Sequence, residues 1–278
     1  MGRPHLVSRL YRAIVLIGLV ALLPGCGSES AHAASPAIAV VAVAPVFSNS
    51  SSPTPTPTPT PTSSSEPTPS LSAPDSGKTA ITGVIVQAGD SIGAGLGADW
   101  AAIDHLGFPA SVVVHNVSVS GKAMQTGYGN RVAELFVFRS TTSPSVLLIQ
   151  QGTNDLYYGT SASSIYKSIL TPFVADARKA GFYVVVDTIL PRSDSGWTPA
   201  MERQRTAYNA LVRANRAGAD AVNDLASDPL MGDSSSSASP SFYADGAHPS
   251  LIGQQRLAVL NAAVLGPFLQ RSIRPLSR

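Results

Sequence analysis

The hydrophobic and polar positions divide the chain into two parts with different patterns. From about residue 78 onward, five apolar runs rich in β-branched residues alternate with segments that carry helical patterns. Strands that alternate with helices indicate a parallel sheet covered by helices on both faces, which is an α/β fold in three layers. The five predicted strands are Ile81–Gln87, Val112–Val119, Val146–Gln151, Tyr183–Ile189 and Ala219–Val222.

Three segments of this part predict helices. A Thr-Pro pair at 198–199 is typical of a helix start, and Gly218 is expected to stop that helix. A helical pattern over 161–180 contains Pro172, so we expect a kink or two short helices there, because proline removes a backbone donor. The last helix is expected over about 250–265, before a Gly-Pro pair.

The first part of the chain has the pattern of an export signal. Three arginines precede the eleven-residue apolar run Ala13–Leu23, which is too short to cross a bilayer core of about 30 Å as a helix. The following Leu-Leu-Pro-Gly-Cys at 22–26 resembles a bacterial lipobox, whose cysteine is lipidated. We expect 1–26 to be a signal peptide and Cys26 to anchor an exported lipoprotein that faces the periplasm or the cell exterior. Cleavage after Ala33, which would give a soluble secreted protein, is one alternative, and an uncleaved membrane anchor is another.

Residues 27–77 are expected to form a disordered linker. Between Ser48 and Ser76, proline alternates with threonine and serine, and proline can support neither a helix nor a sheet ladder. Such a tract is a semi-rigid spacer that reaches up to ~90 Å at about 3.1 Å per residue. The remaining residues, 78–278, are expected to form one catalytic domain.

Charge and cysteine content exclude several classes of protein. From Lys78 onward the chain has 16 Lys and Arg against 14 Asp and Glu, without a basic cluster, so no nucleic-acid partner is expected. The single cysteine, Cys26, lies outside this part, so the domain has no disulfide, thiolate metal site or cysteine nucleophile. We expect a monomer without metal or other cofactor, attached to a membrane only through the lipid.

Two polar segments carry the residues of a nucleophile and a base. The segment Gly-Asp-Ser-Ile-Gly at 89–93 follows the first predicted strand and places Ser91 where N–H groups of a following helix favour negative charge. The segment Asp-Gly-Ala-His at 245–248 places Asp245 three residues before His248, so the carboxylate can orient the imidazole. Taken singly, each segment is also compatible with an ordinary capped turn.

Two further segments follow predicted strands and offer hydrogen-bond donors. Gly121 ends the segment 116–121, and a glycine lets its backbone N–H approach a ligand closely. Asn154 lies in Gly-Thr-Asn-Asp at 152–155, where its amide can point into the same crevice. Because sites form at the carboxyl ends of parallel strands, the four segments together predict a serine hydrolase with the chain order Ser, Asp, His.

Other arrangements fit these residues less well. Gly-x-Ser-x-Gly also surrounds the nucleophile of α/β-hydrolases, but only one predicted strand precedes Ser91 here. In chymotrypsin-like enzymes a histidine precedes the serine, whereas both upstream histidines of this chain lie in the leader region. Glycines at 93–97 match a dinucleotide fingerprint in spacing only, because the second strand ends without an acidic residue. His105 and His115 have no carboxylate partner nearby in sequence and are expected to be structural.

Together the four segments resemble the sequence blocks of the SGNH/GDSL hydrolase superfamily. The resemblance spans about 81–265 and includes Ile-Leu-Pro-Arg at 189–192. It implies a flavodoxin-like three-layer α/β/α sandwich with a five-stranded parallel sheet. The roles that it implies are Ser91 as nucleophile, His248 as general base, Asp245 as its orienting group, and Ser91, Gly121 and Asn154 as oxyanion-hole donors.

The reaction implied is hydrolysis of a carboxylic ester through an acyl-enzyme. We expect short-acyl or O-acetyl esters on carbohydrates as substrates, partly because the spacer suits a bulky extracellular substrate. A lipase, lysophospholipase or thioesterase-like activity is one alternative, and a tethered binding protein without turnover is an alternative from another class. Tyr157, Tyr158 and Trp197 follow site-bearing segments and are candidate substrate-binding residues, with core or surface packing as the alternative account.

Overall fold

The computed structural model describes residues 80–126 and 134–276. The predicted signal peptide, the predicted lipidation site Cys26 and the predicted linker lie outside the described residues. Among the helices that are described, none has the length and hydrophobicity that a membrane span requires.

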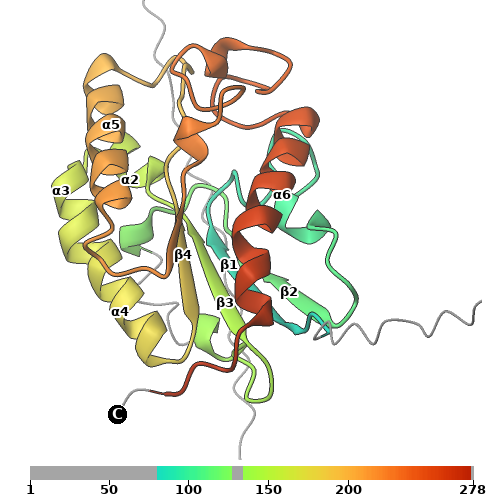
Figure 1. Cartoon of the computed structure of the whole chain (residues 1–278). Helices are drawn as coiled ribbons and strands as arrows, with labels where there is room; N and C mark the ends of the chain where they lie inside the picture. The colour runs from blue at the N-terminus through green and yellow to red at the C-terminus, as the bar shows by residue number, and fades with distance from the viewer. Residues whose placement is uncertain (1–79, 127–133, 277–278) are drawn as a thin grey trace, which may run out of the picture. The chain divides into compact units, whose positions relative to one another are not determined.

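A parallel sheet with the strand order β2-β1-β3-β4-β5 forms the middle layer of the fold (Figure 1). This is the flavodoxin-like order, in which ligands bind outside the carboxyl ends of the strands where the order reverses, between β1 and β3. The predicted α/β class and five-stranded parallel sheet are confirmed. The strands are β1 (Gly83–Gly89), β2 (Val112–Asn116), β3 (Ser145–Gln150), β4 (Tyr183–Asp187) and β5 (Ala221–Asn223).

Helices cover both faces of the sheet, and α3, α4 and α5 lie on the side opposite to α6 (Figure 1). Successive side chains of a strand point to opposite faces. Val86 and Leu147 therefore belong to the hydrophobic core on the α4 side, whereas Ile85 and Leu148 belong to the core on the α6 side. The α-helices are α2 (Thr153–Tyr157), α3 (Ala162–Ser164), α4 (Thr171–Lys179), α5 (Pro199–Ala214) and α6 (Leu251–Leu265).

The second strand is shorter than predicted. It ends at Asn116 instead of Val119, because the Asn116 side chain accepts the backbone N–H of Ser118 at 3.2 Å and turns the chain out of the ladder. This early turn brings the segment 117–121 over the end of β1, where the Val119 N–H donates to the Gly89 carbonyl at 3.1 Å.

Helix α5 begins where the Thr-Pro pair predicts and ends earlier than predicted. The Thr198 hydroxyl caps its first turn. The helix stops at Ala214 and not near Gly218, because Asn215 adopts a left-handed conformation with φ of 47°. Asparagine tolerates this conformation better than most residues other than glycine, so the expected glycine stop is not needed.

The segment 161–180 forms two short helices, as its proline predicts, with a π-helical turn between them. A π-helical turn, Ile165–Leu170, separates α3 from α4. Pro172 lies in the first turn of α4, directly after the π-helical turn. The change in helical pattern just before the proline avoids a clash of its ring with the preceding turn.

A buried carboxyl group lies where β4 and β5 meet α6. The Asn223 side-chain amide donates to Asp187 Oδ1 at 3.0 Å and to Asn261 Oδ1 at 2.9 Å. Within the described part of the chain, Asp187 Oδ2 has no hydrogen-bond partner. Burial raises the pKa of Asp187 to about 8, and the hydrogen bond from Asn223 opposes this only in part. Asp187 therefore holds a proton at neutral pH.

The proton on Asp187 makes stability depend on pH. Between about pH 4 and pH 8 the folded chain holds a proton that the unfolded chain has released, so the free energy of unfolding falls as pH rises. Asp187→Asn removes the titrating group and keeps the Oδ1 acceptor. We expect the free energy of unfolding of the variant, minus that of the wild type, to increase by about 3–4 kcal/mol from pH 5 to pH 9. Urea unfolding at both pH values measures this difference, and a difference that does not change with pH contradicts the assignment.

Candidate active site

Ser91 lies in a turn directly after β1. The Asp90 side chain accepts the backbone N–H of Ile92 at 3.0 Å and so fixes the turn around Ser91. The expected helix after Ser91 is not regular, because residues 91–99 form consecutive turns in which Gly95 and Gly97 have positive φ angles of 79° and 94°. Ser91 is thus presented by a glycine-rich turn, and the expected N-terminus of a regular helix is absent at this point of the described chain.

His248 lies between Ser91 and Asp245. Its Nε2 is 2.9 Å from Ser91 Oγ, and its Nδ1 is 2.8 Å from Asp245 Oδ2. The second carboxylate oxygen, Oδ1, accepts the backbone N–H groups of Ala247 at 3.0 Å and His248 at 2.8 Å. Burial alone would raise the pKa of Asp245, but these hydrogen bonds outweigh it and lower the pKa below the usual range. Asp245 is therefore a carboxylate at neutral pH.

The other two histidines of the described domain lie in aromatic stacks. His105 stacks on Trp100 with ring centroids 4.0 Å apart, and His115 stacks on Phe138 at 4.1 Å. Neither contact involves Ser91, so both stacks agree with the structural role expected for these histidines.

Gly121 and Asn154 lie after the two strands that flank β1. Gly121 has a φ of 74°, which favours glycine. The Asn154 amide donates to the carbonyl of Lys122 at 3.1 Å, which ties the start of α2 to the residue after Gly121. The amide nitrogen carries a second proton, which this bond leaves free. Asp155 strengthens the link, because its carboxylate accepts two backbone N–H groups at 124–125, at 2.7 and 2.9 Å.

Buried glutamines that sequence analysis did not single out hold the nucleophile turn. Gln87, on β1, donates to the Gly93 carbonyl and to the Ser118 hydroxyl, both at 3.0 Å. Gln254, on α6, donates to the Ile92 carbonyl at 2.8 Å. The sequence does carry a signal for such residues, namely a glutamine inside an apolar strand or at an inward-facing helix position. A buried polar group of this kind needs a hydrogen-bond partner, so it indicates a polar contact inside the fold.

The three candidate substrate-binding aromatic residues differ in their surroundings. The Arg192 guanidinium lies over the rings of Tyr157, at 5.0 Å, and Trp197, at 4.9 Å. Trp197 also packs against the hydrophobic core and donates to Glu202 at 3.2 Å. Tyr158 is largely exposed and contacts the edge of Tyr157. Arg192 thus joins two of the three candidates, and Tyr158 lies apart from it.

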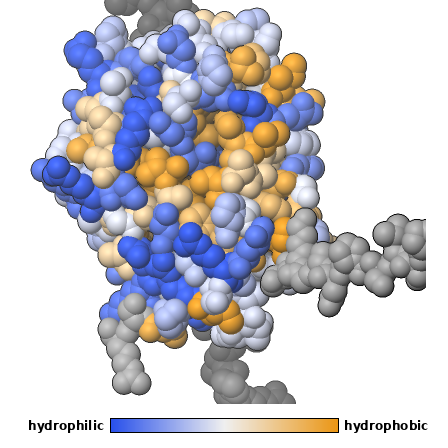
Figure 2. Space-filling model, viewed as in Figure 1, coloured by the Kyte–Doolittle hydropathy of each residue, from blue (hydrophilic) through white to orange (hydrophobic). Residues whose placement is uncertain are grey.

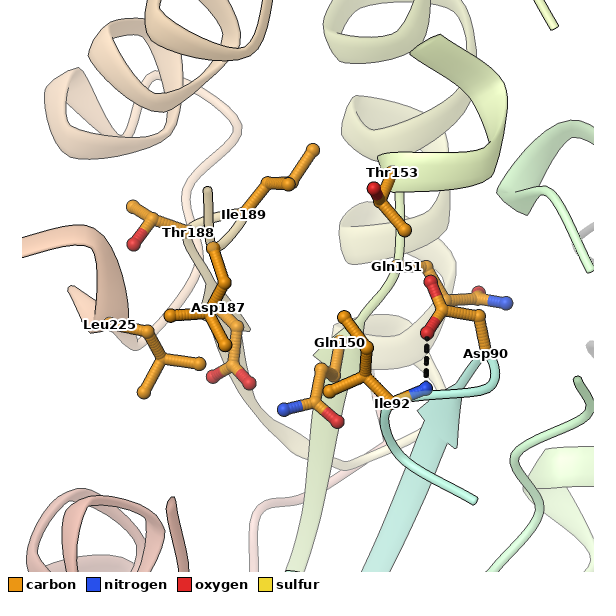
Figure 3. A pocket seen from close by; sticks show the side chains of 10 residues that line it. Asp90, Ile92, Gln150, Gln151, Thr153, Asp187, Thr188, Ile189 and Leu225 are labelled. Atoms are coloured by element: carbon orange, nitrogen blue, oxygen red, sulfur yellow. Dashed lines mark hydrogen bonds between the residues drawn. The ribbon is translucent and has the colours of Figure 1, made fainter. Parts of the chain in front are cut away.

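A small cavity lies beside the nucleophile turn (Figure 3). Its volume of about 20 Å³ is enough for one water molecule. Figure 3 shows the side chains of Asp90, Gln150 and Asp187 around it. Burial raises the pKa of Asp90 to about 7, and the N–H of Ile92 opposes this in part.

In the described residues no group of three or more His, Cys, Asp or Glu is arranged to hold a metal ion.

The comparisons with known proteins agree with this geometry. The model of the GDSL-like lipase/acylhydrolase family matches residues 88–256. The chain belongs to this family. It is therefore a serine hydrolase that acts on ester bonds, and the family resemblance described above is confirmed. No curated protein matches the chain.

Solved structures of GDSL proteins have the same fold. One is a member of the lipolytic protein G-D-S-L family from Veillonella parvula, with 20% identity and a TM-score of 0.53, covering 66% of this chain and 98% of that chain. Another is the lipase/acylhydrolase from Enterococcus faecalis, with 20% identity and a TM-score of 0.50, covering 70% and 98%. At this identity the likeness shows the fold of the GDSL-like domain.

Gly97 packs closely against the turn that carries His248, so a larger residue at this position tests whether the placement of His248 matters for activity. A Cβ at Gly97 would lie 3.0 Å from His248 Cβ and 3.1 Å from the Pro249 carbonyl. We expect Gly97→Ala to displace His248 from Ser91 and to lower kcat/KM for p-nitrophenyl acetate at least about tenfold.

Gly107→Ala is the matched control. Gly107 also has a positive φ, of 72°, but a Cβ there meets no atom within 4 Å. Both variants carry a similar backbone strain of about 1–2 kcal/mol, so Gly107→Ala measures the effect of that strain without the contact with His248. Equal activity of the two variants would show that the contact between Gly97 and His248 does not matter for turnover.

Proposed function

We propose that the protein is a serine esterase in which Ser91 is the nucleophile and His248 is the general base. The observation that carries this proposal is the 2.9 Å contact between Ser91 Oγ and His248 Nε2, continued by the 2.8 Å contact between His248 Nδ1 and Asp245. When Nδ1 donates its proton to the Asp245 carboxylate, Nε2 is left as an acceptor. It can then take the proton of the Ser91 hydroxyl.

The reaction proceeds in two halves. Ser91 Oγ attacks the ester carbonyl carbon while its proton moves to His248 Nε2, and the carbonyl oxygen becomes an oxyanion. The tetrahedral intermediate collapses, the bond to the alcohol breaks, and His248 returns the proton to the leaving oxygen. Water then attacks the acyl-enzyme, again with His248 as base, and the carboxylic acid leaves from Ser91 Oγ.

Three groups are proposed to stabilise the oxyanion: the N–H groups of Ser91 and Gly121 and the amide of Asn154. Their segments lie close together because the Gly89 carbonyl accepts the N–H of Val119 at 3.1 Å and the side-chain amide of Gln151 at 3.3 Å. Each donor of this kind typically lowers the barrier by about 2.7–4 kcal/mol. The ionised Asp245 stabilises the imidazolium that forms in the same step.

We propose short-acyl esters on carbohydrates as the substrates. Tyr157 and Tyr158 follow Asn154 closely and are both exposed, and aromatic faces pack well against the apolar faces of sugar rings. This exposed aromatic surface next to the site supports a sugar as the alcohol part of the ester.

An ester with a longer apolar chain is the second candidate, and an exposed apolar patch favours it. Leu251 and Ile252, at the start of α6, are about half exposed, as are Leu96 and Leu230. Figure 2 shows hydrophobic side chains gathered over this end of α6. Leu251 is three residues from His248, so a chain that leaves the site in this direction would find apolar surface.

Removal of the nucleophile or of the base tests the mechanism. We expect Ser91→Ala and His248→Ala each to lower kcat for p-nitrophenyl acetate by about 10⁴-fold or more, because each group acts only together with the other. A fluorophosphonate probe should label the wild type and fail to label Ser91→Ala. Activity of purified Ser91→Ala near the wild-type level would overturn the proposal, and an unlabelled, inactive wild type would indicate a binding protein without turnover.

A series of p-nitrophenyl esters of increasing chain length, followed by acetylated xylan, separates the two substrate classes. If the enzyme selects short acyl groups, as proposed, we expect kcat/KM to be highest for acetate and to fall about tenfold or more by octanoate. Release of acetate from the polysaccharide should follow. A maximum at long chains would favour the apolar patch and rule out the deacetylase.

A further inference from the structure

Arg192 contacts several of the segments that surround the proposed catalytic residues. Its Nε and Nη2 donate to the two carboxylate oxygens of Asp194 at 2.8 and 2.9 Å, a two-pronged ion pair. Its Nη1 is 3.5 Å from the hydroxyl of Thr153, the first residue of α2. The side chain is only 12% exposed. Arg192 therefore links the loop after β4 to the helix that begins beside Asn154.

The faces of two aromatic rings complete the surroundings of Arg192. The guanidinium lies 5.0 Å from the ring of Tyr157 and 4.9 Å from that of Trp197. The two-pronged ion pair with Asp194 fixes the orientation of the guanidinium plane. The two aromatic rings fix the position of the guanidinium in the direction perpendicular to that plane. Asp194 thus binds two of the donors of Arg192 and offsets its charge, which suits a role in holding this loop in place.

This loop supports the turn that carries Asp245. Ser193, which lies between the two ion-paired residues, donates its N–H to the Gly246 carbonyl at 2.8 Å. Gly246 has a φ of 81°, and a Cβ there would lie 2.8 Å from Ser193 Oγ and 3.0 Å from the Asp194 nitrogen. The two backbones are therefore in direct contact, with no space for a side chain between them.

Asp245 and His248 are joined within one short turn by local hydrogen bonds. Three local hydrogen bonds join the Asp245 carboxylate to the imidazole and to two backbone N–H groups at 247–248. The Asp245 side chain is 55% exposed, so its own packing contributes little to its position. Support against the neighbouring loop comes through Gly246.

We propose that Arg192 is a positioning residue of the esterase, because its ion pair with Asp194 holds the loop against which the turn bearing Asp245 and His248 rests. The inference rests on the proposed roles of Ser91 and His248. Loss of the ion pair lets this turn shift as a unit, which lengthens the contact between Ser91 and His248 and slows acyl transfer. Binding of a small ester does not depend on Arg192, and the bond between His248 and Asp245 stays intact.

The test compares Arg192→Met with Arg213→Met. Arg213 forms the same two-pronged ion pair, with Asp224 at 2.8 and 2.8 Å, outside the proposed catalytic machinery. For p-nitrophenyl acetate we expect Arg192→Met to lower kcat by about 10–100-fold, with KM within about twofold. Arg213→Met should keep the wild-type kcat.

Three further readouts separate positioning from a loss of folded enzyme. First, the fluorophosphonate is allowed to react to completion, and kcat is calculated per labelled active site. Unfolded molecules are not labelled and therefore do not lower this value. Second, the acid limb of kcat against pH should stay in place, because His248 keeps its carboxylate partner. Third, Arg192→Lys should restore kcat only in part, since an ammonium group cannot form the fork.

The outcomes decide between this inference and the proposed function. An inactive Ser91→Ala together with a wild-type kcat per labelled site in Arg192→Met overturns the inference alone. An active Ser91→Ala overturns the proposed function, whatever Arg192 does. If Arg192→Met does not fold, Asp194→Asn tests the same ion pair with nearly unchanged shape: a lowered kcat per labelled site supports the inference, and an unchanged one overturns it.

Discussion

A proton can pass between Ser91 and His248 only while Oγ and Nε2 stay within hydrogen-bond distance, although the two residues lie 157 positions apart in the chain. A parallel sheet meets this requirement, because the carboxyl ends of all its strands lie at one edge. The turn after β1 brings the hydroxyl to that edge, and the loop before α6 brings the imidazole. The central strands β1, β3 and β4 are buried on both faces, so the edge that they form is held firmly in place.

The connections between the loops at this edge are mainly polar. Gln87 and Gln254 bond to backbone carbonyl groups of the nucleophile turn, and Asp155 bonds to backbone N–H groups near Gly121. Backbone groups in such turns lack the partners that a helix or a sheet would supply, so a buried side chain has to provide them. The same network that satisfies these groups also sets the spacing of the residues around the ester.

Much of this arrangement could be predicted from the sequence. Apolar runs of strand length separated by helical patterns predict the sheet, and their order along the chain places Ser91, Gly121 and Asn154 at its carboxyl edge. The pairing of Asp245 with His248 could be predicted because both lie on one short loop, where local spacing determines contact. The SGNH/GDSL resemblance adds the roles of these residues.

Other features depend on contacts that local patterns do not carry. Asn215 ends α5 through a left-handed backbone that glycine was expected to adopt, and glycines after Ser91 prevent the regular helix expected there. The position of Arg192 between Asp194 and two aromatic rings depends on how three separate segments pack. The family resemblance includes Arg192 in the segment 189–192, but spacing and composition do not indicate which groups its guanidinium contacts.

The surface position of Asp245 connects the reaction to the solution around the protein. At physiological ionic strength, dissolved ions screen exposed charges over about 8 Å, whereas buried charges are screened much less. The carboxylate that stabilises the imidazolium is more than half exposed, while Ser91 is buried. The contact of 2.8 Å between this carboxylate and His248 Nδ1 lies well within that distance, so dissolved ions screen the pair only weakly although the carboxylate faces the medium.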